Sequence, residues 1–186
     1  MNKKSLDIIN TYKLPFLLSI TLFVVFLALG TLRETKDILY AFFGALLGSF
    51  ILDSEYFLYA YIFEPDKDFS KNLKGYIKYK DYAEAAKYIK QQKDDIKDKS
   101  LNSALFQIAL GGLSIFATYS VNSIFIKTMI LSTFANSIYR LLEACFNSKH
   151  ESWFWAFKDK PSRNGVFLFT SVMIIILVAS LNIFSR

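Results

Sequence analysis

The stretch ILYAFFGALLGSFILDSEYFLYAYIF, residues 38–63, is long and apolar enough to cross a lipid bilayer, yet it contains Asp53 and Glu55. About 20 consecutive apolar residues are enough for a helix to span the hydrocarbon core. An ionisable side chain inside such a helix costs about 2.5–3.5 kcal/mol on insertion scales, so it usually faces the interior of a helix bundle and meets a partner there. The stretch therefore predicts a membrane span with a polar face turned toward other helices.

Four further segments have the length and apolarity of membrane spans: residues 14–32, about 101–121, about 124–146 and 165–184. The chain of 186 residues is 53% hydrophobic and 17% aromatic, a composition typical of membrane proteins. The first segment is longer than a signal-peptide core, and no small-x-small cleavage site follows it. We therefore predict one membrane domain: an all-α integral membrane protein with five transmembrane helices and a cytoplasmic helical insertion at residues 64–100.

The distribution of Lys and Arg predicts the orientation of these spans. The N-terminus holds three basic residues, segment 64–100 holds ten and segment 147–164 holds four, all on one side of a five-span chain. The other side and its span ends hold only Arg33, Lys36, Lys127 and Arg186. Basic residues accumulate in cytoplasmic loops. The N-terminus is therefore predicted in the cytoplasm and the C-terminus outside.

Segment 64–100 is the largest soluble piece, and its pattern predicts one or two amphipathic helices with Tyr82, Ala86, Ile89 and Ile96 near one face. One interpretation is a solvated helical hairpin that packs on the membrane domain. The other is a docking surface for a protein partner or for anionic lipid. This surface would also include the segment HESWFWAF, residues 150–157, whose two tryptophans fit an interfacial aromatic belt. The candidate surface residues are Lys71, Lys74, Lys78, Lys87, Lys90, Trp153 and Trp155.

Placing the polar residues of the spans by depth predicts one polar layer near the cytoplasmic side. Three spans contribute to it: Asp53 and Glu55 from the second, Asn102, Ser103 and Gln107 from the third, and Asn136, Arg140 and Glu143 from the fourth. The last three share one helical face because they stand at i, i+4 and i+7. Asp53 and Glu55 stand about 200° apart on a helix, so one of them is expected to meet Arg140. The layer is either a structural network that holds three helices together or a binding or catalytic site open to the cytoplasm.

Three pieces of the chain, in order, resemble the motifs of the membrane-bound metal-dependent hydrolases: LDSEYF (52–57), SLNSALF (100–106) and STFANSIYRLLEACF (132–146). That family has an Asp-x-Asp-His motif at the end of an early span, a Thr-His-Ser motif at the start of a later span and a His-x-x-x-Asp motif in the next. The resemblance covers roughly residues 40–145. The segments NSALFQ and WFW are also similar to segments that recur in small membrane proteins of candidate-phyla bacteria, which implies a bacterial inner membrane but no activity.

Carried over residue by residue, the resemblance argues against hydrolysis. The two acids of the first motif match Asp53 and Glu55, but Tyr56, Asn102 and Asn136 occupy the histidine positions and Arg140 occupies the aspartate position. Amides are poor transition-metal ligands compared with imidazole. An arginine can instead neutralise the remaining carboxylates. The comparison therefore predicts an arginine–carboxylate pair where the family has a metal, with no metal ligands and no catalytic residues.

The remaining sequence features narrow the function further. The chain has a single cysteine, Cys145, and a single histidine, His150, and it shows no P-loop, dinucleotide fingerprint or Ser/His/Asp arrangement. Its formal charge of +6 comes without a nucleic-acid recognition motif, while Gly44 and Gly48 favour close helix packing or a dimer. We predict a non-catalytic membrane scaffold or anchor without a cofactor. Its partners would be the bilayer and a cytoplasmic protein, anionic lipid or a second copy, and not nucleic acid. The alternative is a divergent membrane hydrolase that uses Asp53 and Glu55 on a lipid-like substrate.

Overall fold

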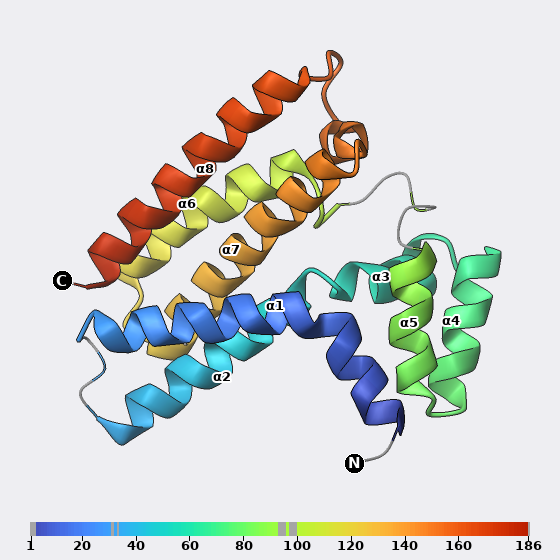
Figure 1. The fold of residues 1–186 in the computed structure, drawn as a ribbon, viewed down its shortest axis with the longest axis horizontal. Helices are drawn as coiled ribbons and strands as arrows, with labels where there is room; N and C mark the ends of the chain where they lie inside the picture. The colour runs from blue at the N-terminus through green and yellow to red at the C-terminus, as the bar shows by residue number, and fades with distance from the viewer. Residues whose placement is uncertain (1–2, 31, 33, 93–95, 97–99, 186) are drawn as a thin grey trace. The chain divides into compact units, whose positions relative to one another are not determined.

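The computed structural model describes residues 3–30, 32, 34–92, 96 and 100–185, with side chains from residue 13 onward. This part of the chain is helical and contains no β-strand. The α-helices are α1 (Lys3–Ala28), α2 (Thr35–Ile51), α3 (Ser54–Leu58), α4 (Asp68–Lys78), α5 (Tyr82–Gln92), α6 (Ala104–Ser120), α7 (Ile124–Phe146) and α8 (Arg163–Phe184) (Figure 1). A turn of π-helix, η1 (Tyr59–Phe63), continues α3, and a 3₁₀ turn, η2 (His150–Phe154), follows α7. The all-helical class predicted from the sequence is confirmed.

The chain divides into two compact units. The smaller unit comprises Met1–Leu14 and Asp53–Lys97, and the larger unit comprises Pro15–Leu52 and Asp98–Arg186. One boundary falls inside α1 at Pro15, where the missing proline N–H removes a helical hydrogen bond. The second falls directly after α2. The second segment of the smaller unit therefore begins at Asp53, inside the stretch 38–63 and before the segment 64–100 that the sequence marks as an insertion.

The smaller unit is built around a hairpin of α4 and α5, which lie side by side (Figure 1). Phe69 and Leu73 of α4 pack against Ala85 and Ile89 of α5, and the rings of Phe69 and Tyr88 stack with centroids 5.5 Å apart. Helix α4 ends in a Schellman motif, in which the amide of Asp81 donates to the Tyr76 carbonyl over 2.9 Å and Lys80 adopts a φ of 58°. This reversal is what brings the apolar faces of the two helices together.

The larger unit is a bundle in which α2 packs along α7, and α6, α7 and α8 pack on one another (Figure 1). The C-terminal part of α1 contributes Leu22 and Phe26 to a core shared with α2, α7 and α8. Between α6, α7 and α8 lies a second core, made by Leu110, Phe134, Ile138 and Met173. A third lies around η2 and contains Ala104, Leu141, Cys145, Trp153, Phe154 and Val166.

The larger unit has an inverted distribution of polarity. Its buried positions include many hydroxyl and amide side chains, while large apolar side chains point outward from every α-helix of the unit. The buried polar residues are Ser19, Ser49, Asn102, Ser103, Gln107, Ser114, Thr118, Thr128, Ser132, Thr133, Asn136, Ser137, Thr170 and Ser180. The exposed apolar residues include Leu17, Val24, Phe43, Leu47, Ile108, Phe116, Ile126, Leu168, Ile175 and Val178. Soluble domains place such groups the other way round.

By length and apolarity alone, one helix of the described chain is able to cross a membrane, α8, rather than the five expected. Helix α2 qualifies only when it is counted with Ser54–Phe63 as one broken span, and Lys13–Ala28 and α6 are apolar but shorter. Helix α7 has the length, 23 residues, but the polar residues expected for the buried layer lower its hydropathy. The interruption at Leu52 and Asp53 is the main difference from the long second span that the sequence predicts.

Candidate functional site

The most extensive helix contact of the larger unit is that between α2 and α7, which two glycines make possible. A Cβ atom on Gly44 would lie 2.5 Å from the Phe125 carbonyl oxygen, and one on Gly48 would lie 2.6 Å from the Met129 carbonyl oxygen. Real Cβ atoms do not approach backbone so closely, so only glycine allows the two backbones this separation. Small residues at spacing of four are the usual means by which helices pack closely in lipid.

A cluster of four buried polar residues lies along this contact and includes α1. Ser19 of α1 forms hydrogen bonds with Ser49 of α2 and, over 3.1 Å, with Ser132 of α7. Ser132 Oγ also lies 2.6 Å from the carbonyl oxygen of Ala45. The amide nitrogen of Asn136 reaches the Ser132 carbonyl oxygen at 2.9 Å and Ser19 Oγ at 3.4 Å. We call Ser19, Ser49, Ser132 and Asn136 the serine–asparagine cluster.

The donors and acceptors of the serine–asparagine cluster can be assigned from chemistry alone. The Ala45 carbonyl only accepts, so Ser132 donates its hydroxyl proton to it. Ser132 Oγ must then accept from Ser19, and Ser19 must accept from Ser49. Both amide protons of Asn136 are used in the same cluster. Every hydroxyl proton therefore has a definite acceptor, and the cluster offers no spare donor to an anionic ligand.

Among the described residues, a few buried polar atoms make no hydrogen bond. In the serine–asparagine cluster the atom without a hydrogen bond is Oδ1 of Asn136. Elsewhere in the larger unit the atoms without one are Nε2 of Gln107, Oγ of Ser137 and Nδ1 of His150. The unused atom of the cluster is an acceptor, so any further partner there would have to be a donor. The arrangement is that of a structural network with one open acceptor position.

A second connection joins three segments of the predicted polar layer. Arg140 of α7 donates from Nη1 to Oδ1 of Asn102 over 3.1 Å. Asn102 in turn donates from Nδ2 to the Leu52 carbonyl oxygen over 3.1 Å. Leu52 is the C-terminal cap of α2, whose last carbonyl groups have no partner within the helix. Asn102 therefore connects α7 to the end of α2 and satisfies part of that helix end.

The other predicted members of the layer have different surroundings. Ser103 caps α6, because its hydroxyl accepts from the Phe106 amide over 3.3 Å and donates to the Ser100 carbonyl over 2.7 Å. Gln107 accepts from the indole Nε1 of Trp153 over 3.0 Å. Glu143 is half-buried on α7. Of the residues predicted as one layer, Asn136 therefore belongs to the serine–asparagine cluster, Asn102 and Arg140 form the connection to α2, and Gln107 binds Trp153.

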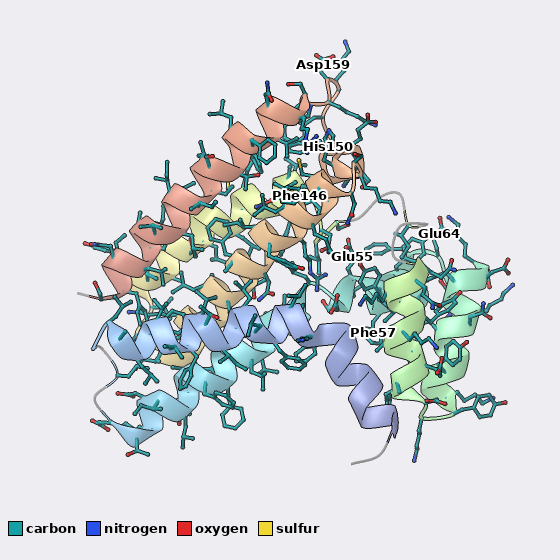
Figure 2. All side chains as sticks on the ribbon, in the orientation of Figure 1. Glu55, Phe57, Glu64, Phe146, His150 and Asp159 are labelled. Carbon is teal, nitrogen blue, oxygen red and sulfur yellow. The ribbon has the colours of Figure 1, made fainter. Side chains whose placement is uncertain are left out.

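The two tryptophans of segment 150–157 differ. Trp153 is only 5% exposed and fills the core around η2, so its prediction as a partner or lipid surface residue is corrected. The physical reason is the hydrogen bond to Gln107, which provides a buried partner for the indole N–H. Trp155 is 42% exposed, as a surface residue should be. Figure 2 labels Phe146, the last residue of α7, and His150 and Asp159 in the segment between α7 and α8.

Asp53 and Glu55 belong to the smaller unit, where both are buried. Asp53 is the N-terminal cap residue of α3, and its carbonyl accepts from the Tyr56 amide over 3.2 Å. Figure 2 labels Glu55 on this helix. Arg140 belongs to the larger unit, so the expected pairing of Arg140 with one of these carboxylates stays a prediction. No three His, Cys, Asp or Glu side chains are grouped for metal binding within the described residues.

The lysines predicted as a docking surface all lie on the α4–α5 hairpin. Lys71, Lys78, Lys87 and Lys90 are exposed, whereas Lys74 is half-buried. Lys74 donates to the Pro65 carbonyl over 3.1 Å and lies 5.4 Å above the Tyr61 ring. Its ammonium group is therefore held at one place beside the aromatic side chain.

Three residues of the serine–asparagine cluster, Ser19, Ser49 and Ser132, were not predicted as site residues. A hydroxyl group in an apolar run is common because it can bond to its own helix, so single serines carry little signal. The available signal was the placement of Ser49 directly after Gly48, with Gly44 one turn earlier, a combination of small residues that indicates a tight helix contact.

Comparisons with protein-family models, curated proteins and solved structures find no match to this chain.

Proposed function

We propose that this chain is a non-catalytic membrane anchor. In this proposal the larger unit is a helical bundle in the membrane, with five crossings formed by α1, α2, α6, α7 and α8. The smaller unit is held at the cytoplasmic surface, where its α4–α5 hairpin is presented to a cytoplasmic partner or to anionic lipid. The N-terminus lies in the cytoplasm and the C-terminus outside, and the membrane is a bacterial inner membrane.

The observation that carries the proposal is the inverted polarity of the larger unit. Hydroxyl and amide groups are buried between its helices, and Leu, Ile, Val and Phe side chains face outward along them. In water, this exposed apolar surface would cost free energy over its whole area, at roughly 25 cal/mol per Å². In lipid the same surface has no such cost, and the buried hydroxyl groups connect the helices.

The three shorter or more polar helices fit the same environment. Helices α2 and α6 each contain 17 residues, about 26 Å at 1.5 Å per residue, slightly below the hydrocarbon thickness of about 30 Å. Such helices are accommodated by local thinning of the bilayer. The polar residues of α7 are largely turned inward, where they bond to α1, α2 and the segment before α6.

The lack of spare donors in the serine–asparagine cluster supports a structural rather than a catalytic role for it. Its serines have no base among their hydrogen-bond partners, which are hydroxyl, amide and carbonyl groups. For the alternative, a divergent hydrolase, the chain provides Asp53 and Glu55 without an imidazole beside them in the sequence.

Two experiments test the proposal on the full chain. Membranes from cells that express it are washed in alkaline carbonate, and the protein should stay in the membrane pellet; release into the supernatant would contradict the anchor. Purified protein is then analysed for bound metal, alone and as Asp53→Ala. Stoichiometric metal that the substitution removes would favour the hydrolase instead.

Orientation is tested with cysteine reporters in a Cys145→Ala background, because Cys145 is the only native cysteine. Lys90→Cys should react with an impermeant thiol reagent only when the cytoplasmic side is open. Asn182→Cys, on an exposed position of α8, should react from the outside in intact spheroplasts. The reverse pattern would overturn the proposed orientation.

A further inference from the structure

The second half of the long apolar stretch, Ser54–Phe63, has an outward apolar face that the hairpin of its own unit does not cover. Phe57, Leu58, Tyr61 and Ile62 point outward, and Ile62 is 65% exposed. Figure 2 labels Phe57 on this helix. The four residues stand at i, i+1, i+4 and i+5, so they form one continuous face of α3 and η1. We call them the outer face of this helix.

The opposite face of the same helix is buried in the smaller unit. Tyr56 and Ala60 belong to a core with Phe69 and Leu73 of α4 and Ile89 of α5. The outward sides of α4 and α5 carry the exposed lysines Lys71, Lys78, Lys87 and Lys90. A helix covered on one side by such a charged hairpin cannot be surrounded by hydrocarbon, because each lysine would also have to enter the bilayer core.

Two lysines lie beside the aromatic residues of this helix. Lys67 donates to Tyr59 Oη over 3.1 Å and lies 3.1 Å from a carboxylate oxygen of Glu64. Lys74 lies 5.4 Å above the Tyr61 ring. Tyrosine rings with lysine ammonium groups beside them are typical of the level of lipid head groups, where one end of each side chain is apolar and the other is hydrated.

From this geometry we propose that Ser54–Phe63 lies along the membrane surface as an interfacial helix and does not cross the bilayer. The outer face enters the boundary between the head groups and acyl chains, and Lys67 and Lys74 lie among the lipid phosphates. The chain leaves the membrane at the end of α2, near Leu52 and Asp53, and the α4–α5 hairpin covers the cytoplasmic side of the interfacial helix. The inference rests on the proposed membrane function, and its occupant is the lipid bilayer that holds the larger unit.

Continuity with α2 and the nature of the exposed residues favour lipid over a protein partner. Only two residues, Leu52 and Asp53, separate the interfacial helix from the end of an apolar helix, α2. Its outer face is two aromatic rings, a leucine and an isoleucine with lysines beside it, the composition of helices that lie in the interface plane of membranes.

A depth measurement by electron paramagnetic resonance distinguishes a surface helix from a spanning helix. Nitroxide labels are placed at Phe57→Cys and Ile62→Cys, singly, in the full chain with Cys145→Ala, in vesicles of phosphatidylethanolamine and phosphatidylglycerol. Relaxation by oxygen and by a water-soluble nickel chelate gives the depth of each label. Both labels should have the same depth, about 5–10 Å below the phosphates.

In a spanning helix the two labels would instead differ in depth by about 7.5 Å, because they are five residues apart and each residue adds about 1.5 Å along the helix axis. That difference would overturn the inference, and so would full access of both labels to the nickel chelate. A label at Tyr79→Cys, on the hairpin turn and 81% exposed, is the aqueous reference. Circular dichroism of each variant excludes loss of helical structure.

A label at Phe43→Cys, on the exposed face of α2, separates the inference from the proposed function on which it rests. It should be deep in the hydrocarbon region. If Phe43 is in water, the membrane anchor itself is wrong. If Phe43 is deep while the labels at residues 57 and 62 differ in depth or are both in water, only the interfacial helix is wrong.

Discussion

Ser132 on α7 donates a 2.6 Å hydrogen bond to the backbone carbonyl of Ala45 on α2. A side chain as short as serine reaches the backbone of another helix only when the two helices are very close. Gly44 and Gly48 provide that closeness, since a Cβ atom at either position would overlap α7. The hydrogen bond and the glycines are thus parts of one contact, and they respond to substitution in different ways.

Gly44→Ala should destabilise the protein strongly, by roughly 2–4 kcal/mol, because the added methyl group overlaps the Phe125 carbonyl oxygen and the two helices must separate. Unfolding in mixed micelles with increasing SDS, followed by circular dichroism, measures the change. Gly112→Ala on α6 is the matched control, because a Cβ there meets nothing within 4 Å. It should be neutral or stabilise by up to about 1 kcal/mol; equal losses at both positions would contradict the close contact.

Ser132→Ala should cost about 0.6–1.7 kcal/mol, the range found for interhelical hydrogen bonds in membranes. The substitution removes the donor to Ala45 and the acceptor of Ser19 together. The same unfolding titration measures it. Ser171→Ala serves as control, because its exposed hydroxyl bonds only to the Phe167 carbonyl of its own helix. If Ser171→Ala lost as much stability as Ser132→Ala, the serine–asparagine cluster would not contribute to stability as described.

Trp153→Phe should cost about 1–3 kcal/mol, since it leaves the buried carbonyl oxygen of Gln107 without its donor. In the double variant with Gln107→Leu the total loss should be smaller than the sum of the two single losses, because the unpaired amide is gone. Additive losses would show that the two side chains are not coupled. Tyr119→Phe, at an exposed position of α6, controls for the loss of a polar group from a ring.

Asn102→Ala should destabilise the C-terminal turn of α2, because it removes the donor to the Leu52 carbonyl and the acceptor of Arg140. A loss of about 1–3 kcal/mol is expected for such buried polar partners. Hydrogen exchange followed by mass spectrometry should show faster exchange in the peptides at the end of α2. Asn182→Ala, on the exposed side of α8, should leave exchange there unchanged, and an unchanged rate in Asn102→Ala as well would contradict the role assigned to Asn102.

The helical class of the chain could be predicted from the sequence because it depends on long apolar runs, which are local. The break after α2 could not be predicted in the same way. Apolar residues continue on both sides of Asp53, so composition alone indicates one long helix. What ends α2 and starts a new helix is tertiary: Tyr56 and Ala60 find their apolar partners on α4 and α5.

The grouping of polar residues was predictable only in part. Asn136 and Arg140 stand four residues apart on α7, and their spacing predicts one shared layer. One helical turn advances about 5.4 Å along the axis, so the two side chains reach different neighbours. Asn136 meets Ser19 of α1, and Arg140 meets Asn102 before α6. Which neighbour stands at which height depends on how the helices pack, and one helix's own sequence does not contain that information.

The arrangement of α1, α2 and α7 also constrains the order in which the chain can assemble during synthesis. Ser19 and Ser49 are 30 residues apart, so their hydrogen bond can form as soon as α2 has been made. Ser132 is made 87 residues after its partner Ala45. Until then Gly44 and Gly48 of α2 lack their partner on α7, and we expect α1 and α2 to pair without it. We expect crosslinking between cysteines at Phe16 and Phe50, whose rings are 5.4 Å apart in the finished protein, to appear in nascent chains that end before α7. Its appearance only after α7 is complete would mean that the three helices assemble together.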